Sequence, residues 1–154
     1  MRLIVVSPGK VRESWLQAGI DEYVKRLGRY CQVSLVIVDD VPDNWPGSKA
    51  LEEEGRRLLT KIRPQAFVVA LDLNGQQADS LELARLLPAW LCEGGSEVVF
   101  VIGGSNGLAP AVLARSQIRL CLSKLTFTHQ MARLILLEQC YRAFRIASGE
   151  PYHK

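Results

Sequence analysis

The hydrophobic positions of the chain alternate between short runs rich in Val and Ile and longer segments in which apolar residues recur every three or four positions. The first pattern is typical of strands and the second of amphipathic helices. The candidate strands are residues 3–6, 33–38, 66–71, 98–102 and 118–122. The runs at 66–71 and 98–102 are apolar at nearly every position, as in parallel strands that are covered on both faces. The alternation predicts an α/β fold with a parallel sheet.

Helices are predicted between and after these strands. They cover residues 15–27, 48–63 and 79–92, a short segment that begins near Pro110, and residues 130–148. Gly28 follows the first helix as a natural stop. Asp79 and Glu82 have the spacing of a capping box at the start of the third helix, and Pro88 is expected to kink or divide that helix.

The length of the chain, 154 residues, is enough for one hydrophobic core and too short for two. We therefore expect residues 1–154 to form a single domain. The longest apolar runs are far shorter than the ~20 residues of a membrane span. The N-terminal run at 3–6 is also shorter than the ~7–15 residues of a signal-peptide core. These features predict a cytoplasmic protein without a membrane partner.

Four cysteines and two histidines are spread along the chain without a Cys-x-x-Cys pair or another spacing of metal ligands. Free cysteines are usually buried, because the thiol behaves as a small apolar group. We therefore predict reduced core thiols, and we expect no bound metal. The cysteines are Cys31, Cys92, Cys121 and Cys140.

The net charge of +3 is unevenly distributed along the chain. Residues 1–97 carry 12 Lys or Arg and 14 Asp or Glu, whereas residues 98–154 carry 7 Lys or Arg and only 2 Asp or Glu. A basic final third favours an anionic partner at that end of the chain. On charge alone, a solvated helix face explains the bias equally well.

Three loops follow predicted strands at the edge where parallel sheets bind ligands. They are residues 72–75, 103–108 and 123–129. The glycines of the second loop would let a ligand lie against bare backbone, although the same residues also suit a tight turn. No loop has the spacing of a Walker A motif, a dinucleotide fingerprint or a serine nucleophile elbow. This disfavours ATP hydrolysis, ordinary NAD binding and serine nucleophile chemistry, and leaves an α/β domain with a ligand crevice and a basic end.

Five stretches of the sequence carry a resemblance to a known family. They are residues 71–75, 100–108, 122–133, 138–144 and 151–154, the last of which reads Pro-Tyr-His-Lys. With the opening residues 5–10 and 22–27, they make the whole chain similar to the bacterial 23S rRNA pseudouridine-N3 methyltransferase family. This is the large-subunit methyltransferase H type of the SPOUT class. The glycine loop together with Tyr-His-Lys at this spacing is the specific part of the resemblance.

The resemblance implies an S-adenosylmethionine-dependent enzyme with a SPOUT-type α/β fold. In that fold, helices flank a parallel sheet core and the C-terminal part forms a trefoil knot, although knots are rare among protein topologies. The residues that would line the cofactor site are Leu71, Gly103, Gly104, Leu122, Ser123, Lys124, Leu125, Thr126 and Phe127. The family usually places proline where this chain has Thr128.

The resemblance also implies a homodimer in which the tail of one subunit completes the active site of the other. The acceptor would be N3 of a pseudouridine, an imide that must lose its proton. Histidine exchanges protons near neutral pH, so His153 is the candidate general base or orienting group. Arg142 would stabilise the developing imidate, and Tyr152 would stack on or orient the base. The candidate phosphate contacts are Lys10, Arg133 and Lys154.

The size of the chain bears on the substrate, because a small monomer has little surface for distinguishing one RNA helix from all others. We therefore expect 23S rRNA within the assembled 70S ribosome to be the substrate. Three alternatives stay open. The chain could be a SPOUT enzyme that methylates a ribose 2′-hydroxyl of RNA, a non-enzymatic RNA-binding or ribosome-assembly factor, or a small-ligand sensor that is independent of RNA.

Overall fold

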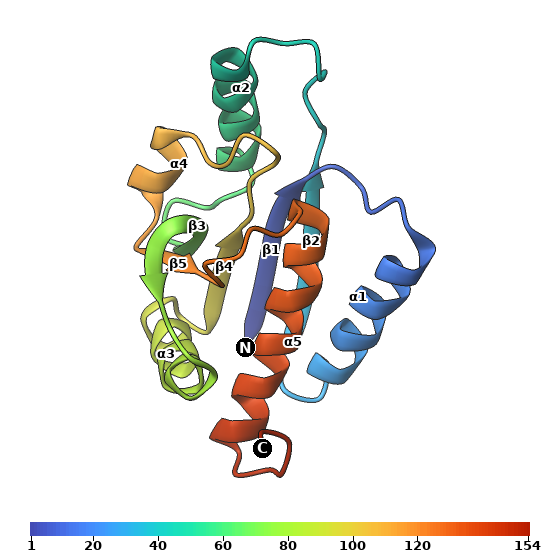
Figure 1. Ribbon diagram of the computed structural model, residues 1–154. Helices are drawn as coiled ribbons and strands as arrows, with labels where there is room; N and C mark the ends of the chain where they lie inside the picture. Colours follow the sequence, from blue (N-terminus) through green and yellow to red (C-terminus); the bar gives the residue numbers. More distant parts are fainter.

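The computed structural model describes residues 1–154 and contains a five-stranded parallel sheet with helices on both faces (Figure 1). The strands are β1 (Arg2–Pro8), β2 (Gln32–Val38), β3 (Phe67–Gln77), β4 (Glu97–Val101) and β5 (Ile118–Cys121). The helices are α1 (Ser14–Leu27), α2 (Gly47–Leu59), α3 (Ser80–Glu93), α4 (Pro110–Arg115) and α5 (His129–Ala147). The strand order is β2-β1-β4-β3-β5, and every neighbouring pair is parallel. The predicted α/β fold is confirmed, whereas the knot stays a prediction.

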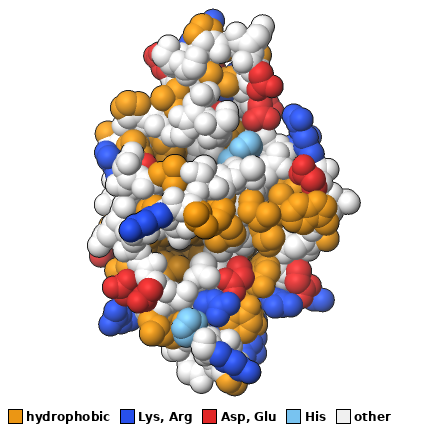
Figure 2. Space-filling model, viewed as in Figure 1, with side chains coloured by type: hydrophobic (Ala, Val, Ile, Leu, Met, Phe, Trp, Pro, Cys, Tyr) orange, Lys and Arg blue, Asp and Glu red, His pale blue; other side chains and the backbone are white.

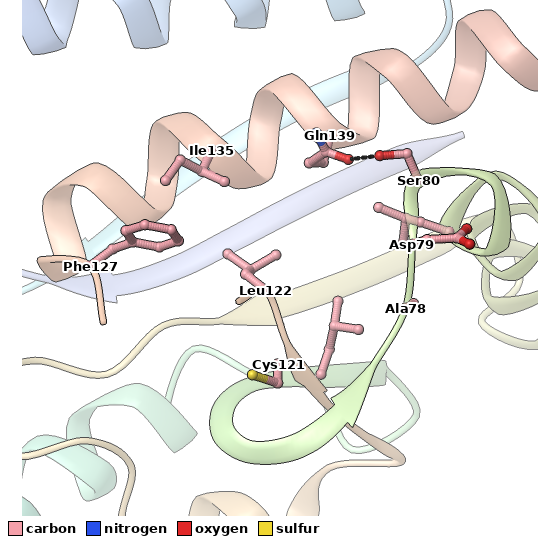
Figure 3. Close-up of a pocket in the computed structure, with 10 residues that line it drawn as sticks. Ala78, Asp79, Ser80, Cys121, Leu122, Phe127, Ile135 and Gln139 are labelled. Atoms are coloured by element: carbon pink, nitrogen blue, oxygen red, sulfur yellow. Dashed lines mark hydrogen bonds between the residues drawn. The ribbon is translucent and has the colours of Figure 1, made fainter. Parts of the chain in front are cut away.

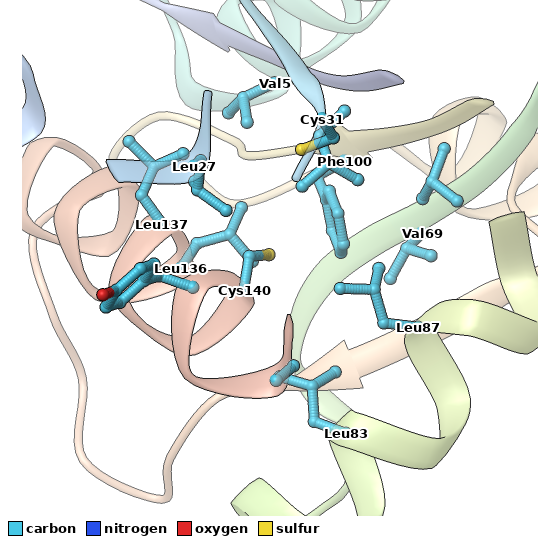
Figure 4. Close-up of a cluster of buried hydrophobic side chains, with 14 of the residues drawn as sticks. Val5, Leu27, Cys31, Val69, Leu83, Leu87, Phe100, Leu136, Leu137 and Cys140 are labelled. Carbon is cyan, nitrogen blue, oxygen red and sulfur yellow. The ribbon is translucent and has the colours of Figure 1, made fainter. Parts of the chain in front are cut away.

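Alternate residues of the central strands supply two separate cores, one on each face of the sheet, so the expectation that the chain is too short for two cores is wrong. Val5 and Phe100 belong to the core that α1, α3 and α5 cover, whereas their neighbours Val6 and Val101 belong to the core that α2 and α4 cover. Figure 4 shows the first core, where side chains from the three helices surround Phe100. Both faces of the sheet are therefore buried, which explains why the runs at β3 and β4 are almost entirely apolar.

The helix ends follow local sequence signals. Asp79 and Glu82 form the predicted capping box of α3, each side chain bonding the other residue's backbone amide. Pro88 lies inside α3 and the helix continues through it, so Pro88 does not divide this helix. The alternative expectation, a kink at Pro88, stays a prediction. The hydroxyl of Thr128 accepts a hydrogen bond from the amide of Met131 and caps α5. No helix combines the length and the apolar sequence that crossing a membrane requires.

Strand β3 is longer than predicted and contains a wide bulge. Leu71 and Gln76 both pair with Leu120 of β5, so residues 72–75 leave the sheet before the strand resumes. Gly75 permits this path, because a Cβ at that position would lie only 2.7 Å from the backbone carbonyl of Arg119. Residues 72–75 therefore form a bulge within β3, and the expectation that they are a loop after the strand is wrong. No apolar alternation at 76–77 indicates in the sequence that the strand continues.

Three of the four cysteines are buried, but Cys92 is exposed. The prediction that all four lie in the core is therefore wrong for Cys92. Its neighbours Trp90 and Leu91 are the buried residues of this last turn of α3, which leaves Cys92 on the outer side. All four thiols are free.

Candidate active site

A cleft of about 1240 Å³ opens at the carboxyl ends of β3, β4 and β5. Its walls come from the bulge of β3, from the loops that follow β4 and β5, and from the first turns of α1 and α5. Parallel α/β sheets bind ligands at this edge. A cleft of this size is large enough for a nucleoside cofactor.

The cleft brings together all the predicted cofactor residues except one. Its lining includes Leu71, Gly103, Gly104, Leu122, Ser123, Leu125, Thr126 and Phe127. Lys124 is exposed and lies outside this lining, although its neighbours on both sides belong to it. The role of these residues in holding a cofactor stays a prediction.

The glycine loop of the cleft is closed by its own backbone. The amide of Gly107 donates to the carbonyl of Gly104 over 3.1 Å, and Gly107 has a positive φ of 80°. This conformation favours glycine because it has no Cβ. A Cβ at Gly103 would lie only 2.3 Å from the carbonyl oxygen of Gly107. A side chain at residue 103 would therefore deform the loop itself, besides filling space in the cleft.

Few charges line the cleft. Glu13 and Asp72 contribute carboxylates, and Arg119 contributes the one guanidinium of the lining. His129 is half-buried at the start of α5, and burial, reinforced by nearby Arg133, lowers the pKa of its imidazole. His129 is therefore uncharged at neutral pH, and the cleft presents more negative than positive charge to a ligand.

A second cavity, of about 310 Å³, lies between α3, β5 and α5 (Figure 3). It shares Leu120, Leu122 and Phe127 with the main cleft, so these apolar residues separate the two spaces. At its other side, the Ser80 hydroxyl donates to the side-chain oxygen of Gln139 over 2.6 Å. The second cavity thus extends from the wall of the cleft to the middle of α5.

The predicted catalytic residues gather at the C-terminal end of α5. Arg142 donates to Glu138 over 2.5 Å, and a guanidinium nitrogen of Arg142 lies 3.3 Å from Nδ1 of His153. The Arg142 guanidinium also lies over the Tyr152 ring, 4.7 Å from its centroid. Tyr152 in turn donates to the same oxygen of Glu138 over 3.2 Å. Glu138, which carried no predicted role, thus orders both Arg142 and Tyr152, and we call these four residues the tail cluster.

Tyr152 holds the tail against the body of the protein. Its ring packs edge-on against Tyr141, with 5.0 Å between the ring centroids, and its hydroxyl lies 3.5 Å from that of Tyr23. Burial, followed by the hydrogen bond with Tyr23, raises the pKa of Tyr152 to about 12. The phenol therefore stays protonated at neutral pH and remains a hydrogen-bond donor.

The cleft and the tail cluster lie far apart within one chain. Ala132 lines the cleft and Arg142 lies ten residues further along α5, a separation of about 15 Å at ~1.5 Å per residue. Figure 2 shows the two histidine surfaces, in pale blue, well separated on the same face. Methyl transfer needs reacting atoms roughly 3–3.5 Å apart. The tail cluster of a chain therefore cannot act on a ligand in its own cleft in this conformation.

The predicted phosphate contacts do not share one environment. Lys10 and Lys154 are exposed, whereas Arg133 is only 2% exposed. Arg133 donates to the backbone carbonyls of Pro8 and Gly9, the second bond being 2.6 Å long, so it ties α5 to the end of β1. The structure thus corrects the expectation for Arg133, whose charge does not reach the surface. No group of His, Cys, Asp and Glu side chains is arranged to hold a metal ion.

Two contributions to the site were missed from the sequence. The first turn of α1 brings Trp15, with 61% of its surface exposed, to the rim of the cleft. Glu54 of α2 contacts the glycine loop from the other side. Trp15 could have been noticed as a large apolar residue at a helix start, but nothing local links position 54 to a loop fifty residues away.

Comparison with known proteins identifies the family. Residues 1–153 match the family described as "Predicted SPOUT methyltransferase", and the chain belongs to this family of methyltransferases. It is 46% identical to the "Ribosomal RNA large subunit methyltransferase H" of Clostridium botulinum (strain Alaska E43 / Type E3) over 159 residues that cover 100% of both chains. It is 48% identical to the "Putative ribosomal RNA large subunit methyltransferase H" of Methanoregula boonei over 162 residues, again with 100% of both chains covered.

A solved structure, TrmJ from Z. mobilis ZM4, aligns with 99% of this chain and 71% of its own chain, at 16% sequence identity and a TM-score of 0.49. The family match and the two relatives confirm the resemblance that the loops and the Tyr-His-Lys tail indicated.

Proposed function

We propose that the protein is a homodimeric, single-domain enzyme of the cytoplasm that transfers a methyl group from S-adenosylmethionine to N3 of a pseudouridine in 23S rRNA of the 70S ribosome. The observation that carries the proposal is the cleft of open backbone and apolar side chains at the carboxyl ends of β3, β4 and β5. Membership of the SPOUT family supports the methyl transfer. The names of the two relatives support large-subunit rRNA as the substrate.

The lining of the cleft fits S-adenosylmethionine, which supplies a reactive methyl group on a positively charged sulfonium. Leu122 and Phe127 offer apolar surface to an adenine ring. Glu13 and Asp72 would attract the cationic groups of the cofactor, and Arg119 would attract its carboxylate. Because His129 is neutral, it adds no charge that would repel a sulfonium.

The tail cluster fits the acceptor side of the reaction. The hydrogen bond with Glu138 raises the pKa of Arg142, so the guanidinium stays charged and can stabilise an imidate. Arginine only donates hydrogen bonds, so its contact with His153 requires Nδ1 to be unprotonated and places the imidazole proton on Nε2. His153 would then orient the base by donating from Nε2, and would accept the N3 proton only after separating from Arg142.

The separation of about 15 Å along α5 supports a dimer in which each cleft receives the tail cluster of the other chain. Ala132, Ile135, Gln139 and Arg142 lie at spacings that share one face of α5, and all four are only partly buried. This face joins the cleft to the tail cluster. A second copy packed against it in the opposite direction would place its own tail cluster at the cleft.

The experiment that tests the proposal is the transfer of tritiated methyl groups to purified ribosomes. We expect label in 23S rRNA when the ribosomes carry the acceptor pseudouridine, and little label when they lack it or when protein-free rRNA replaces them. Equal labelling of protein-free rRNA would contradict the ribosomal substrate, and labelling of ribosomes without pseudouridine would contradict the acceptor.

Two further measurements separate the alternatives. Mass spectrometry of the digested RNA distinguishes a methylated base from a methylated ribose. Calorimetry with S-adenosylmethionine distinguishes an enzyme from a non-enzymatic RNA-binding factor, which would bind no cofactor.

A further inference from the structure

The glycine loop is held from outside the cleft by a buried carboxylate. Glu54 lies on α2, on the face of the sheet opposite α5, and only 7% of its surface is exposed. Its Oε1 accepts a hydrogen bond of 2.8 Å from the backbone amide of Gly104. This contact joins two segments fifty residues apart, and Gly104 is one of the residues that line the cleft.

The fit between α2 and the loop is close at two successive residues of the helix. A Cβ at Gly104 would lie 2.8 Å and 3.0 Å from the two carboxylate oxygens of Glu54. A Cβ at Gly55 would lie 2.6 Å from the Cβ of Ala109, which follows the loop. Glu54 therefore meets the first part of the loop and Gly55 meets its end, and neither glycine tolerates a side chain without movement.

Glu54 is unlike the other acidic residues of its helix. Glu53 pairs with Arg56 and Arg57 at the surface, whereas no ion pair includes Glu54. Burial raises the pKa of Glu54, because a carboxylate is costly to place there, and the charge of Asp40 adds to this effect. Only the Gly104 amide and the charge of Arg57 oppose it. A buried acid that lacks a cationic partner stabilises a fold poorly. Its geometry instead matches a role in shaping the loop.

We propose that Glu54 is a positioning residue of the cofactor site, whose carboxylate fixes the backbone of Gly104 and thereby sets the shape that the glycine loop presents to S-adenosylmethionine. The amide of Gly104 is bonded to Glu54, and its carbonyl is bonded to the amide of Gly107, so this residue is fastened on both sides. The role rests on the proposed function. It is distinct from catalysis, because Glu54 does not line the cleft.

The test compares Glu54→Ala, which removes the acceptor, with Glu54→Gln, which keeps a side-chain oxygen at the same reach. The control is Glu52→Ala on an exposed position of the same helix. We expect Glu54→Ala to weaken S-adenosylmethionine binding about tenfold or more, because it leaves the Gly104 amide unpaired. Glu54→Gln and Glu52→Ala should bind like the wild type. Calorimetry gives the Kd, and the kcat with saturating cofactor should change little in any variant.

A shorter acid keeps the test decisive if Glu54→Ala does not fold. Glu54→Asp retains the charge but withdraws the oxygen from Gly104, so it should bind cofactor more weakly than Glu54→Gln. Unchanged affinity in Glu54→Ala, or normal binding by Glu54→Asp together with weak binding by Glu54→Gln, would overturn the inference. If the wild type itself bound no cofactor, the proposed function would fail, whereas equal binding by the wild type and all variants would refute only the role of Glu54.

Discussion

The cleft and the tail cluster lie at opposite ends of α5 and consist of different chemical groups. The cleft combines apolar side chains with the backbone of the glycine loop, where Gly103 and Gly104 leave no room for a side chain, whereas the tail cluster consists of long side chains ordered by Glu138. Glycine backbone allows a cofactor to approach closely, because no Cβ intervenes. Charged side chains can stabilise an anion as it develops. Because the two ends are about 15 Å apart along one helix, the proposed dimer would place the cleft and the tail cluster of each chain in different active sites.

The largest expected effect comes from separating the two halves onto different chains. Gly103→Val should disable the cleft and His153→Ala should disable the tail cluster, so each variant alone should be nearly inactive. Mixing them at equal amounts, with exchange of subunits, should restore about a quarter of the wild-type methylation, because half of the dimers then contain one intact cleft facing one intact tail. Methyl incorporation into ribosomes measures the recovery.

The control for this mixture is a sample that contains only the double variant, which carries both changes on one chain. It should stay inactive, since no cleft meets an intact tail. If the mixture of single variants also stayed inactive while forming mixed dimers, completion of the cleft by a partner's tail would be refuted.

A smaller effect should divide binding from turnover. Gly103→Ala should raise the Kd for S-adenosylmethionine about tenfold or more, because its Cβ would meet the carbonyl oxygen of Gly107 at 2.3 Å. Arg142→Ala should leave that Kd unchanged and lower kcat by about 10²–10³-fold, because it removes a charge needed only as the imidate forms. Calorimetry and steady-state kinetics on the two variants give both numbers. If Gly103→Ala and Arg142→Ala both weakened S-adenosylmethionine binding to a similar extent, the assignment of cofactor binding to the cleft alone would be contradicted.

A third effect concerns stability rather than activity. Arg133→Met should lower the free energy of unfolding by about 2 kcal/mol, because it leaves the buried carbonyls of Pro8 and Gly9 without their donor. Urea denaturation measures the loss. The salt dependence of ribosome binding should not change, whereas Lys10→Ala should reduce its slope. If Arg133→Met also reduced the slope of ribosome binding against salt concentration, Arg133 would contact RNA after all.

The smallest effect tests whether the buried cysteines of the folded protein are shielded from solvent. Burial raises the pKa of Cys31 to about 11 and also raises the pKa of Cys140, so thiolate is scarce at pH 8 at both positions. A thiol reagent at that pH should modify Cys92 alone in the native protein, and all four cysteines after unfolding. Cys92→Ser should show no rapid reaction, and a second reactive thiol in the folded protein would show that the core opens readily.

The sequence predicts the elements well because their signals are local. Five apolar runs and the Asp79 capping signal are read from neighbouring residues, and the structure follows them. The return of β3 and the contact of Glu54 with Gly104 depend on residues distant in the chain, so no local pattern reports them. Arg133 is intermediate, because it shares the spacing of buried Leu136 and Cys140 on α5 and a strict use of helical periodicity would have placed it inward.

The cofactor residues were predicted from the family resemblance and not from physical reasoning on the sequence. Local chemistry indicated only a crevice beside the glycine loop, and the structure now brings most of the named residues to one cleft. The tail could not be placed by reasoning from its sequence, because Tyr152 is held by Tyr23, Tyr141 and Glu138, all contributed by other parts of the chain.

Helix α5 spans nineteen residues without interruption. Adding or removing a single residue inside it would turn everything beyond that point by about 100° and shift it by ~1.5 Å. We therefore expect insertions and deletions to be excluded between His129 and Ala147, so that the length of this helix is constant wherever the same chemistry is retained.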